Sequence, residues 1–137
     1  MNSYEIKQEA RRERLSSRAK RLRAAAQRLA QHVIGLIEPH YPKGENGHPP
    51  KPLAVMLRIY FMQQWFNLSD PQAENGLYDG ESMRRFAGLE LADDALPDET
   101  TICKFRHLLE RHQLTGAIYL PNRQIARGAR VGPKSPD

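Results

Sequence analysis

Basic side chains crowd the N-terminal segment RRERLSSRAKRLR, residues 11–23, where one glutamate stands among seven Arg or Lys. Guanidinium and ammonium groups on a helix can neutralise the phosphates of nucleic acid without selecting a base sequence. The same composition also fits a solvated helix face or an unfolded basic arm. The arm residues that we select as candidate DNA contacts are Arg11, Arg12, Arg14, Arg18 and Arg21.

A second group of candidate contacts lies further along the chain. In a helix predicted over residues 98–114, a rotation of 100° per residue places Lys104, His107 and Arg111 opposite the apolar side chains. A small helical core that exposes one basic helix is the layout of helix-turn-helix DNA readers. An ordinary solvated face is the alternative, and the nearby Glu110 favours it. The body candidates are Arg84, Arg85, Lys104, Arg106 and Arg111.

The residue types needed for catalysis or metal binding are present but poorly arranged. The acidic residues of 90–99 have no His or Cys at ligand spacing, so we interpret them as a solvated loop and a helix cap. His107 and His112 would lie about 140° apart on a helix, and Cys103 lacks the partners of a catalytic nucleophile. We therefore predict no catalytic residue, no metal site and no cofactor.

The charge of the chain is uneven along its length. The total is +5, but residues 1–31 hold nine Lys or Arg against three Glu, whereas residues 32–114 hold eight against twelve Asp or Glu. Residues 115–137 hold four basic residues against one Asp. The sequence thus consists of a basic arm, a mildly acidic body and a basic tail, and its basic ends favour nucleic acid as a partner.

The cysteine content and the apolar segments indicate the compartment. Cys103 is the single cysteine, so no internal disulfide can form, which fits a reducing environment. The N-terminus lacks the apolar run of a signal peptide. The most apolar region, residues 53–66, is interrupted by Arg58 and two glutamines and is too short to span a bilayer. We expect a cytoplasmic protein without a membrane segment.

A long helix over residues 3–37 is expected to carry the basic arm. The segment lacks Pro and is rich in Ala, Arg, Gln, Glu and Leu, which are good helix formers. Leucines recur every seven residues with Ala or Val between them, which is an a/d pattern. This stripe either docks on the rest of the chain or joins two copies in a homodimer. Its leucines are Leu15, Leu22, Leu29 and Leu36.

Shorter helices are predicted after a linker rich in Pro and Gly, residues 38–52. Residues 52–67 are apolar nearly all round, which predicts the central helix of the core. Helical segments over about 70–78 and 83–86 should precede the helix of 98–114.

The predicted fold class is all-α: a long basic N-terminal helix, a small helix-turn-helix-like bundle and a disordered C-terminal tail. The tail contains Gly, Pro and basic residues, which should leave most of it unfolded after Leu120. The expected domains are 1–37 for the basic arm, 38–52 for the linker, 53–114 for the helical domain and 115–137 for the tail.

Three stretches carry a resemblance to a known family, namely IEPHYPKGENGHPPKPLAVMLRIYFMQQWFNLSD, LYDGESMRRFAGLEL and ALPDETTICKFRHLLERHQL. From about residue 37 to residue 114 the chain resembles the N-terminal, DUF772-like region of IS5-type insertion-sequence transposases. The resemblance implies a helical DNA-binding module that precedes a catalytic domain with an RNase H fold. In that family a DDE set of carboxylates in the catalytic domain holds two divalent metal ions, and none of those carboxylates can be matched here.

Outside these stretches the sequence differs from that family. Residues 1–30 resemble the start of DUF3560-type proteins, and ARGARVGPKSPD, residues 126–137, reads like a frame-shifted or foreign ending. The expectation is a truncated transposase-like protein of a mobile element, which binds DNA and lacks the catalytic domain. Two alternatives stay open: a helical interaction or inhibitor protein encoded on a mobile element, and a gene fragment without a function.

Overall fold

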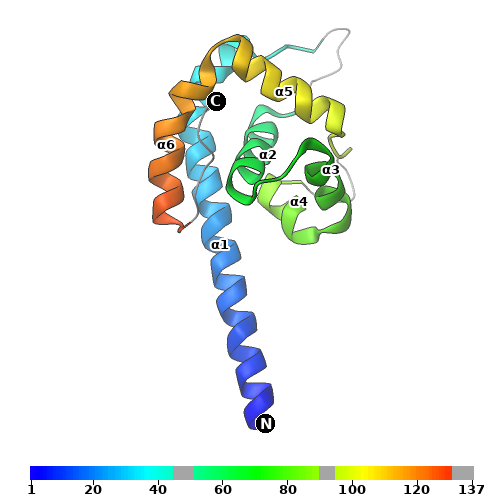
Figure 1. The fold of residues 1–137 in the computed structure, drawn as a ribbon, viewed down its shortest axis with the longest axis vertical. Helices are drawn as coiled ribbons and strands as arrows, with labels where there is room; N and C mark the ends of the chain where they lie inside the picture. Colours follow the sequence, from blue (N-terminus) through cyan, green and yellow to red (C-terminus); the bar gives the residue numbers. More distant parts are fainter. Residues whose placement is uncertain (45–50, 90–94, 131–137) are drawn as a thin grey trace.

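The computed structural model describes residues 1–44, 51–89 and 95–130, and its regular elements there are all helical (Figure 1). The predicted all-α class is confirmed, and the first helix has the predicted bounds. The elements are α1 (Ser3–Ile37), the short 3-10 helix η1 (Glu38–His40), α2 (Leu53–Phe66), α3 (Asp70–Asp79), α4 (Glu81–Ala87), α5 (Glu99–Arg111) and α6 (Leu114–Gly128).

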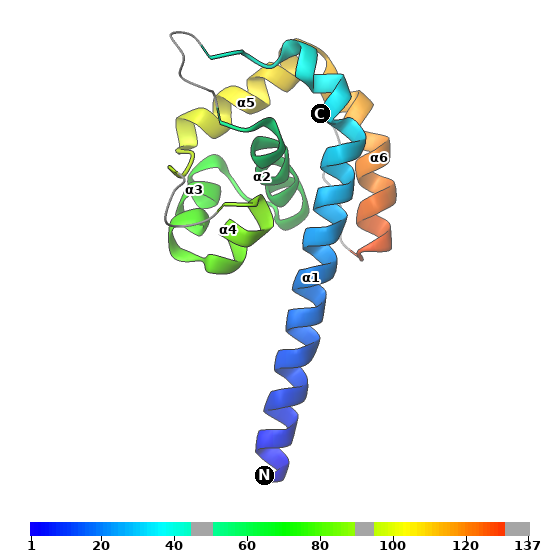
Figure 2. The ribbon, with the colours of Figure 1, turned by 180° about the vertical axis from the view of Figure 1, so that it is seen from behind.

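The two halves of α1 have different surroundings. The helix starts at a capping box, in which Asn2 and Glu5 each accept a hydrogen bond from the backbone N–H of the other. No residue from Met1 to Arg21 is buried, and this half extends beyond the other helices (Figures 1 and 2). The second half buries a stripe of helical period: Leu22, Ala25, Ala26, Leu29, Ala30, Val33 and Ile37.

The four leucines predicted as one stripe are divided between core and solvent. Leu22 and Leu29 are buried, whereas Leu15 and Leu36 are 57% and 45% exposed. Leu15 lies on the extended half of α1, where no residue is buried. Positions seven apart drift by about 20° on a straight helix, which turns Leu36 toward the edge of the buried face. The middle of the leucine stripe therefore docks on its own chain, and Leu22 and Leu29 are not free to form the seam of the predicted homodimer.

The central helix of the core is α2, as predicted. Its buried residues, which include Leu57, Phe61 and Gln63, surround the helix, so no side of it faces water along its length. Such a helix has to be covered from several directions. It packs against α1 on one side and against α3, α4 and α5 on the others (Figure 1).

The short helices α3 and α4 both pack against α2, and α3 also packs against α5. Ser69 caps α3 and Asp98 caps α5, each through a side-chain oxygen that accepts a backbone N–H. At the end of α4, Gly88 has φ +78°, a left-handed conformation that favours glycine, and a Cβ there would also lie 2.6 Å from a guanidinium nitrogen of Arg58. The face of α5 predicted to be apolar supplies the buried residues Ile102, Phe105 and Leu109.

The C-terminal segment departs most from the prediction. Most of residues 115–137 were expected to be disordered, yet α6 continues to Gly128 and packs against α1 and α5. Ile118 and Ala126 are buried on its inner face. Burial of this apolar face stabilises the helix despite Pro121, because tertiary packing contributes more to helix stability than intrinsic propensity does. The remaining residues, 131–137, lie outside the described part of the chain.

Two further predictions involve residues that the structure does not describe. The Pro- and Gly-rich linker includes residues 45–50, and the acidic loop includes residues 90–94. Of the helices in the described ranges, none is both long enough and apolar enough to cross a membrane.

Candidate nucleic-acid interface

The five arm candidates lie on the extended half of α1 and are all exposed. None of them forms an ion pair with another described residue. Helical geometry gathers most of them, with two further cations, into a band about 100° wide and about 32 Å long. We call this band the basic stripe. It consists of Lys7, Arg11, Arg14, Arg18, Arg21 and Arg28.

Neighbouring cations within the basic stripe repel each other. Lys7 and Arg11, and likewise Arg14 and Arg18, are four residues apart, which makes them neighbours on the helix surface. Each such pair of like charges destabilises a helix by about 0.2–0.5 kcal/mol. An anion that lies along the stripe would remove this repulsion, so the stripe is suited to a linear polyanion.

The outward face predicted for α5 is exposed to solvent. Lys104, His107 and Arg111 are exposed there, and neither Lys104 nor Arg111 forms an ion pair with a described residue. Glu99 and Glu110 are exposed on the same helix, so its surface carries mixed charge. This face can meet a nucleic acid, but its electrostatic attraction is weaker than that of the basic stripe.

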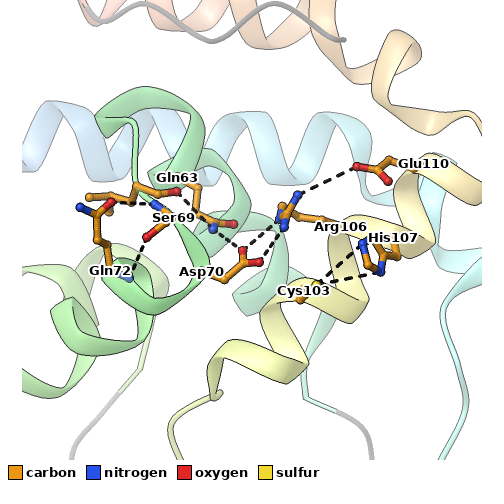
Figure 3. Close-up of polar contacts among 9 residues, drawn as sticks. Gln63, Ser69, Asp70, Gln72, Cys103, Arg106, His107 and Glu110 are labelled. Atoms are coloured by element: carbon orange, nitrogen blue, oxygen red, sulfur yellow. Dashed lines mark hydrogen bonds and ion pairs between the residues drawn. The ribbon is translucent and has the colours of Figure 1, made fainter.

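Arg106, another predicted DNA contact on α5, is partly buried and bonded to side chains of neighbouring helices (Figure 3). Its Nε and Nη2 atoms lie 2.9 and 2.6 Å from the two carboxylate oxygens of Asp70, and Gln63 Nε2 donates to the same carboxylate at 2.8 Å. Hydrogen bonding from Arg106 lowers the pKa of Asp70 from its ordinary value of 3.8. This cluster joins α2, α3 and α5, so the Arg106 guanidinium already has its anion.

The two arginines of α4 also interact with other groups of the protein. Arg84 is 7% exposed, and its Nη1 donates to the carbonyl oxygens of Leu77 at 2.8 Å and Tyr78 at 2.9 Å. These carbonyls belong to the last turn of α3, where helices leave acceptors without partners. Arg84 is therefore a structural residue, and its burial corrects the prediction that it contacts DNA. Arg85 is exposed but lies 2.7 Å from Glu81.

The other reactive side chains form pairs rather than a larger site. Cys103 Sγ lies 3.7 Å from His107 Nε2, one turn away on α5 (Figure 3). The rings of His40 and His112 stack with 4.2 Å between their centroids. Among the described residues, no three His, Cys, Asp or Glu side chains are gathered to hold a metal ion. The residues described here thus do not fit the divalent ions implied by the resemblance.

The arginines of the C-terminal segment belong to a folded surface that was not predicted from the sequence. Arg123 and Arg127 are exposed on α6, and Arg130 is exposed in the turn that follows it. The signal was available in the apolar residues Ile118 and Ala126, whose separation of two helical turns predicts one buried face. The Gly and Pro residues of the segment outweighed that pattern in the prediction.

Comparison with known proteins identifies the family. Residues 9–108 match the family described as Transposase domain (DUF772). The match begins well before residue 37, where the resemblance started, so most of α1 lies within the matched region. No solved structure matches the chain. Because the match spans more than half of the sequence, the chain belongs to the DUF772 transposase-domain family.

Proposed function

We propose that this chain binds duplex DNA as the helical module of an IS5-type transposase, and that residues 1–137 do not cut DNA themselves. The observation that carries the proposal is the basic stripe, whose cations share one face and form no ion pair with any described residue. Duplex DNA is the linear polyanion that complements such a band. Membership of a transposase-domain family supports DNA as that polyanion.

The two exposed basic surfaces have different roles in this proposal. The stripe on α1 contacts phosphates, which adds affinity and sets orientation without selecting a sequence. The outward face of α5 presents Lys104, His107 and Arg111 after two short helices, in the manner of a recognition helix. Base contacts, where they occur, are expected from α5.

Fluorescence anisotropy with a labelled duplex at several salt concentrations tests the proposal. The logarithm of the binding constant should fall linearly with the logarithm of salt, by about 0.9 for each phosphate contact. The double variant Arg14→Gln/Arg18→Gln should reduce this slope by about 1.8. Substitution is preferable to deletion of residues 1–31, because deletion would remove Leu22 and Leu29 from the core.

A charge-matched control separates local contact from net charge. Lys43→Glu lowers the net charge by the same two units at one exposed position outside the stripe. This variant should keep the wild-type slope. Absence of duplex binding by the wild-type chain at low salt would refute the proposal.

The second half of the proposal concerns catalysis. The chain is incubated with supercoiled plasmid and Mg²⁺ or Mn²⁺, and the products are separated on a gel. We expect the plasmid to stay supercoiled, because the described residues gather no carboxylate set for metal ions. Nicking that co-purifies with the wild-type chain would contradict this expectation.

A further inference from the structure

Two helices from opposite ends of the sequence form a layer in which all charged side chains are basic. α1 and α6 run side by side in opposite directions, and α6 ends near the middle of α1, where the packed half of α1 meets the extended half (Figures 1 and 2). No Asp or Glu occurs in residues 14–37 or 114–130, which we call the α1/α6 layer. Its cations are Arg14, Arg18, Lys20, Arg21, Arg23, Arg28, Arg123, Arg127 and Arg130.

Buried contacts fix which face of α6 is presented to solvent. Asn122 is 3% exposed, and its Oδ1 accepts a hydrogen bond of 2.7 Å from the indole Nε1 of Trp65 on α2. Ile118 and Ala126, one turn to either side of Asn122, are also buried. With this side turned inward, Arg123 and Arg127 are left exposed one turn apart on the outer surface.

The charges of the two helices are close enough to act together. Packed helices have axes about 8–10 Å apart, a distance similar to the Debye length of about 8 Å at physiological salt. The positive potentials of the two helices therefore overlap, and the layer contains no carboxylate to reduce them. A polyanion that contacts both helices would offset the repulsion within each and between them.

We propose that Arg123, Arg127 and Arg130 form a second line of phosphate contacts, so that one DNA duplex lies against both helices of the α1/α6 layer. The inference rests on the proposed function, since it takes duplex DNA as the ligand of the basic stripe. It adds a binding site on α6, whose ligand is the phosphodiester backbone. Both lines bind the polyanion as point charges and read no sequence.

The double variant Arg123→Gln/Arg127→Gln tests this site in the same salt titration. The slope of log K against log salt should decrease by about 1.8, as for two lost phosphate contacts. Lys43→Glu, which removes equal charge elsewhere, should leave the slope unchanged. Arg123→Lys/Arg127→Lys should also retain the wild-type slope, because an ammonium group can replace a guanidinium as a point charge.

The fold of each variant can be checked by an independent signal. Trp65 is the only tryptophan in the chain, and it is bonded to Asn122 on α6. Its fluorescence emission therefore reports whether α6 remains docked. We expect unchanged emission in the Gln and Lys variants, because Arg123 and Arg127 are exposed.

The outcomes separate this inference from the proposed function. A wild-type slope in Arg123→Gln/Arg127→Gln, together with a reduced slope in Arg14→Gln/Arg18→Gln, would overturn the α6 site and leave DNA binding intact. A reduced salt slope in Arg123→Lys/Arg127→Lys would contradict the claim that these residues bind phosphates as point charges. If the wild-type chain bound a single-stranded RNA more tightly than a DNA duplex of equal length, the assignment of duplex DNA as the ligand would be overturned. Failure of the wild-type chain to bind at low salt would refute the proposed function itself.

Discussion

The α1/α6 layer and the α2–α5 part of the molecule use arginine in opposite ways. In the layer, arginines such as Arg18 and Arg127 are exposed, and residues 14–37 and 114–130 contain no Asp or Glu that could pair with them. In the α2–α5 part, Arg84 donates to backbone carbonyls and Arg106 to Asp70. The comparison teaches that an arginine's availability for a ligand depends on the acceptors around it, not on its helix or its spacing.

The largest expected effect contrasts the two halves of α1. Leu29→Ala should lower the free energy of unfolding by about 2–5 kcal/mol, because it leaves a cavity in the core. Leu15→Ala, at an equivalent heptad position, should change it by less than about 0.5 kcal/mol, because Leu15 is exposed. Urea unfolding followed by circular dichroism measures both. Equal losses would show that the extended half is also packed, for example in a dimer.

The next effect is expected where the α2–α5 part neutralises its own arginine. Asp70→Asn should cost about 1.5–3 kcal/mol at neutral pH, as for hydrogen bonds to a charged group. The pKa of Asp70 is lowered from 3.8 in the folded state. Its contribution is therefore complete above about pH 4 and is lost as pH falls through the folded-state pKa. Denaturation at several pH values should show the variant and wild type converging in acid, and a constant difference would contradict this.

A smaller effect is expected at the hydrogen bond that joins the layer to α2. Asn122→Ala leaves the buried indole N–H of Trp65 without its acceptor, which should cost about 1–2 kcal/mol. Tryptophan fluorescence during urea unfolding measures this cost. Gln124→Ala, at an exposed position on α6, is the matched control and should unfold as wild type does. Equal behaviour of the two variants would show that this bond does not hold α6.

The smallest effect tests whether the cations of the layer repel one another. Raising salt from about 0.05 to about 0.5 M shortens the Debye length from roughly 14 to roughly 4 Å. We expect this to stabilise wild type by a few tenths of a kcal/mol more than Arg123→Gln/Arg127→Gln. Thermal unfolding without DNA measures the difference. The same salt response in both proteins would indicate that the two helices do not share one electrostatic surface.

Much of the fold could be predicted from local sequence. The bounds of α1, the central position of α2 and the cap at Asp98 follow from composition, apolar pattern and capping chemistry, all of which act within a few residues. α6 could not be predicted in this way, because Pro121 and the glycines weaken the helix locally. Its stability comes from contacts with α1 and α5, which are far away in sequence.

The candidate interface was predicted less completely than the fold. The exposed arm arginines follow from a segment with few apolar residues, which cannot be buried. The engagement of Arg106 could not be foreseen, since Asp70 lies 36 residues earlier on another helix. Arg84 is similar, because its acceptors are carbonyls that the end of α3 exposes.

The sequence by itself determined that the chain is helical, that its two ends are basic and that residues 3–37 form one helix. Helix propensity and formal charge are properties of residues and their near neighbours, so they can be read without a fold. The tertiary structure alone decided which arginines are neutralised and which are exposed. It also brought α1 and α6 together, because pairing of charges and burial of apolar faces depend on distances between segments that are remote in sequence.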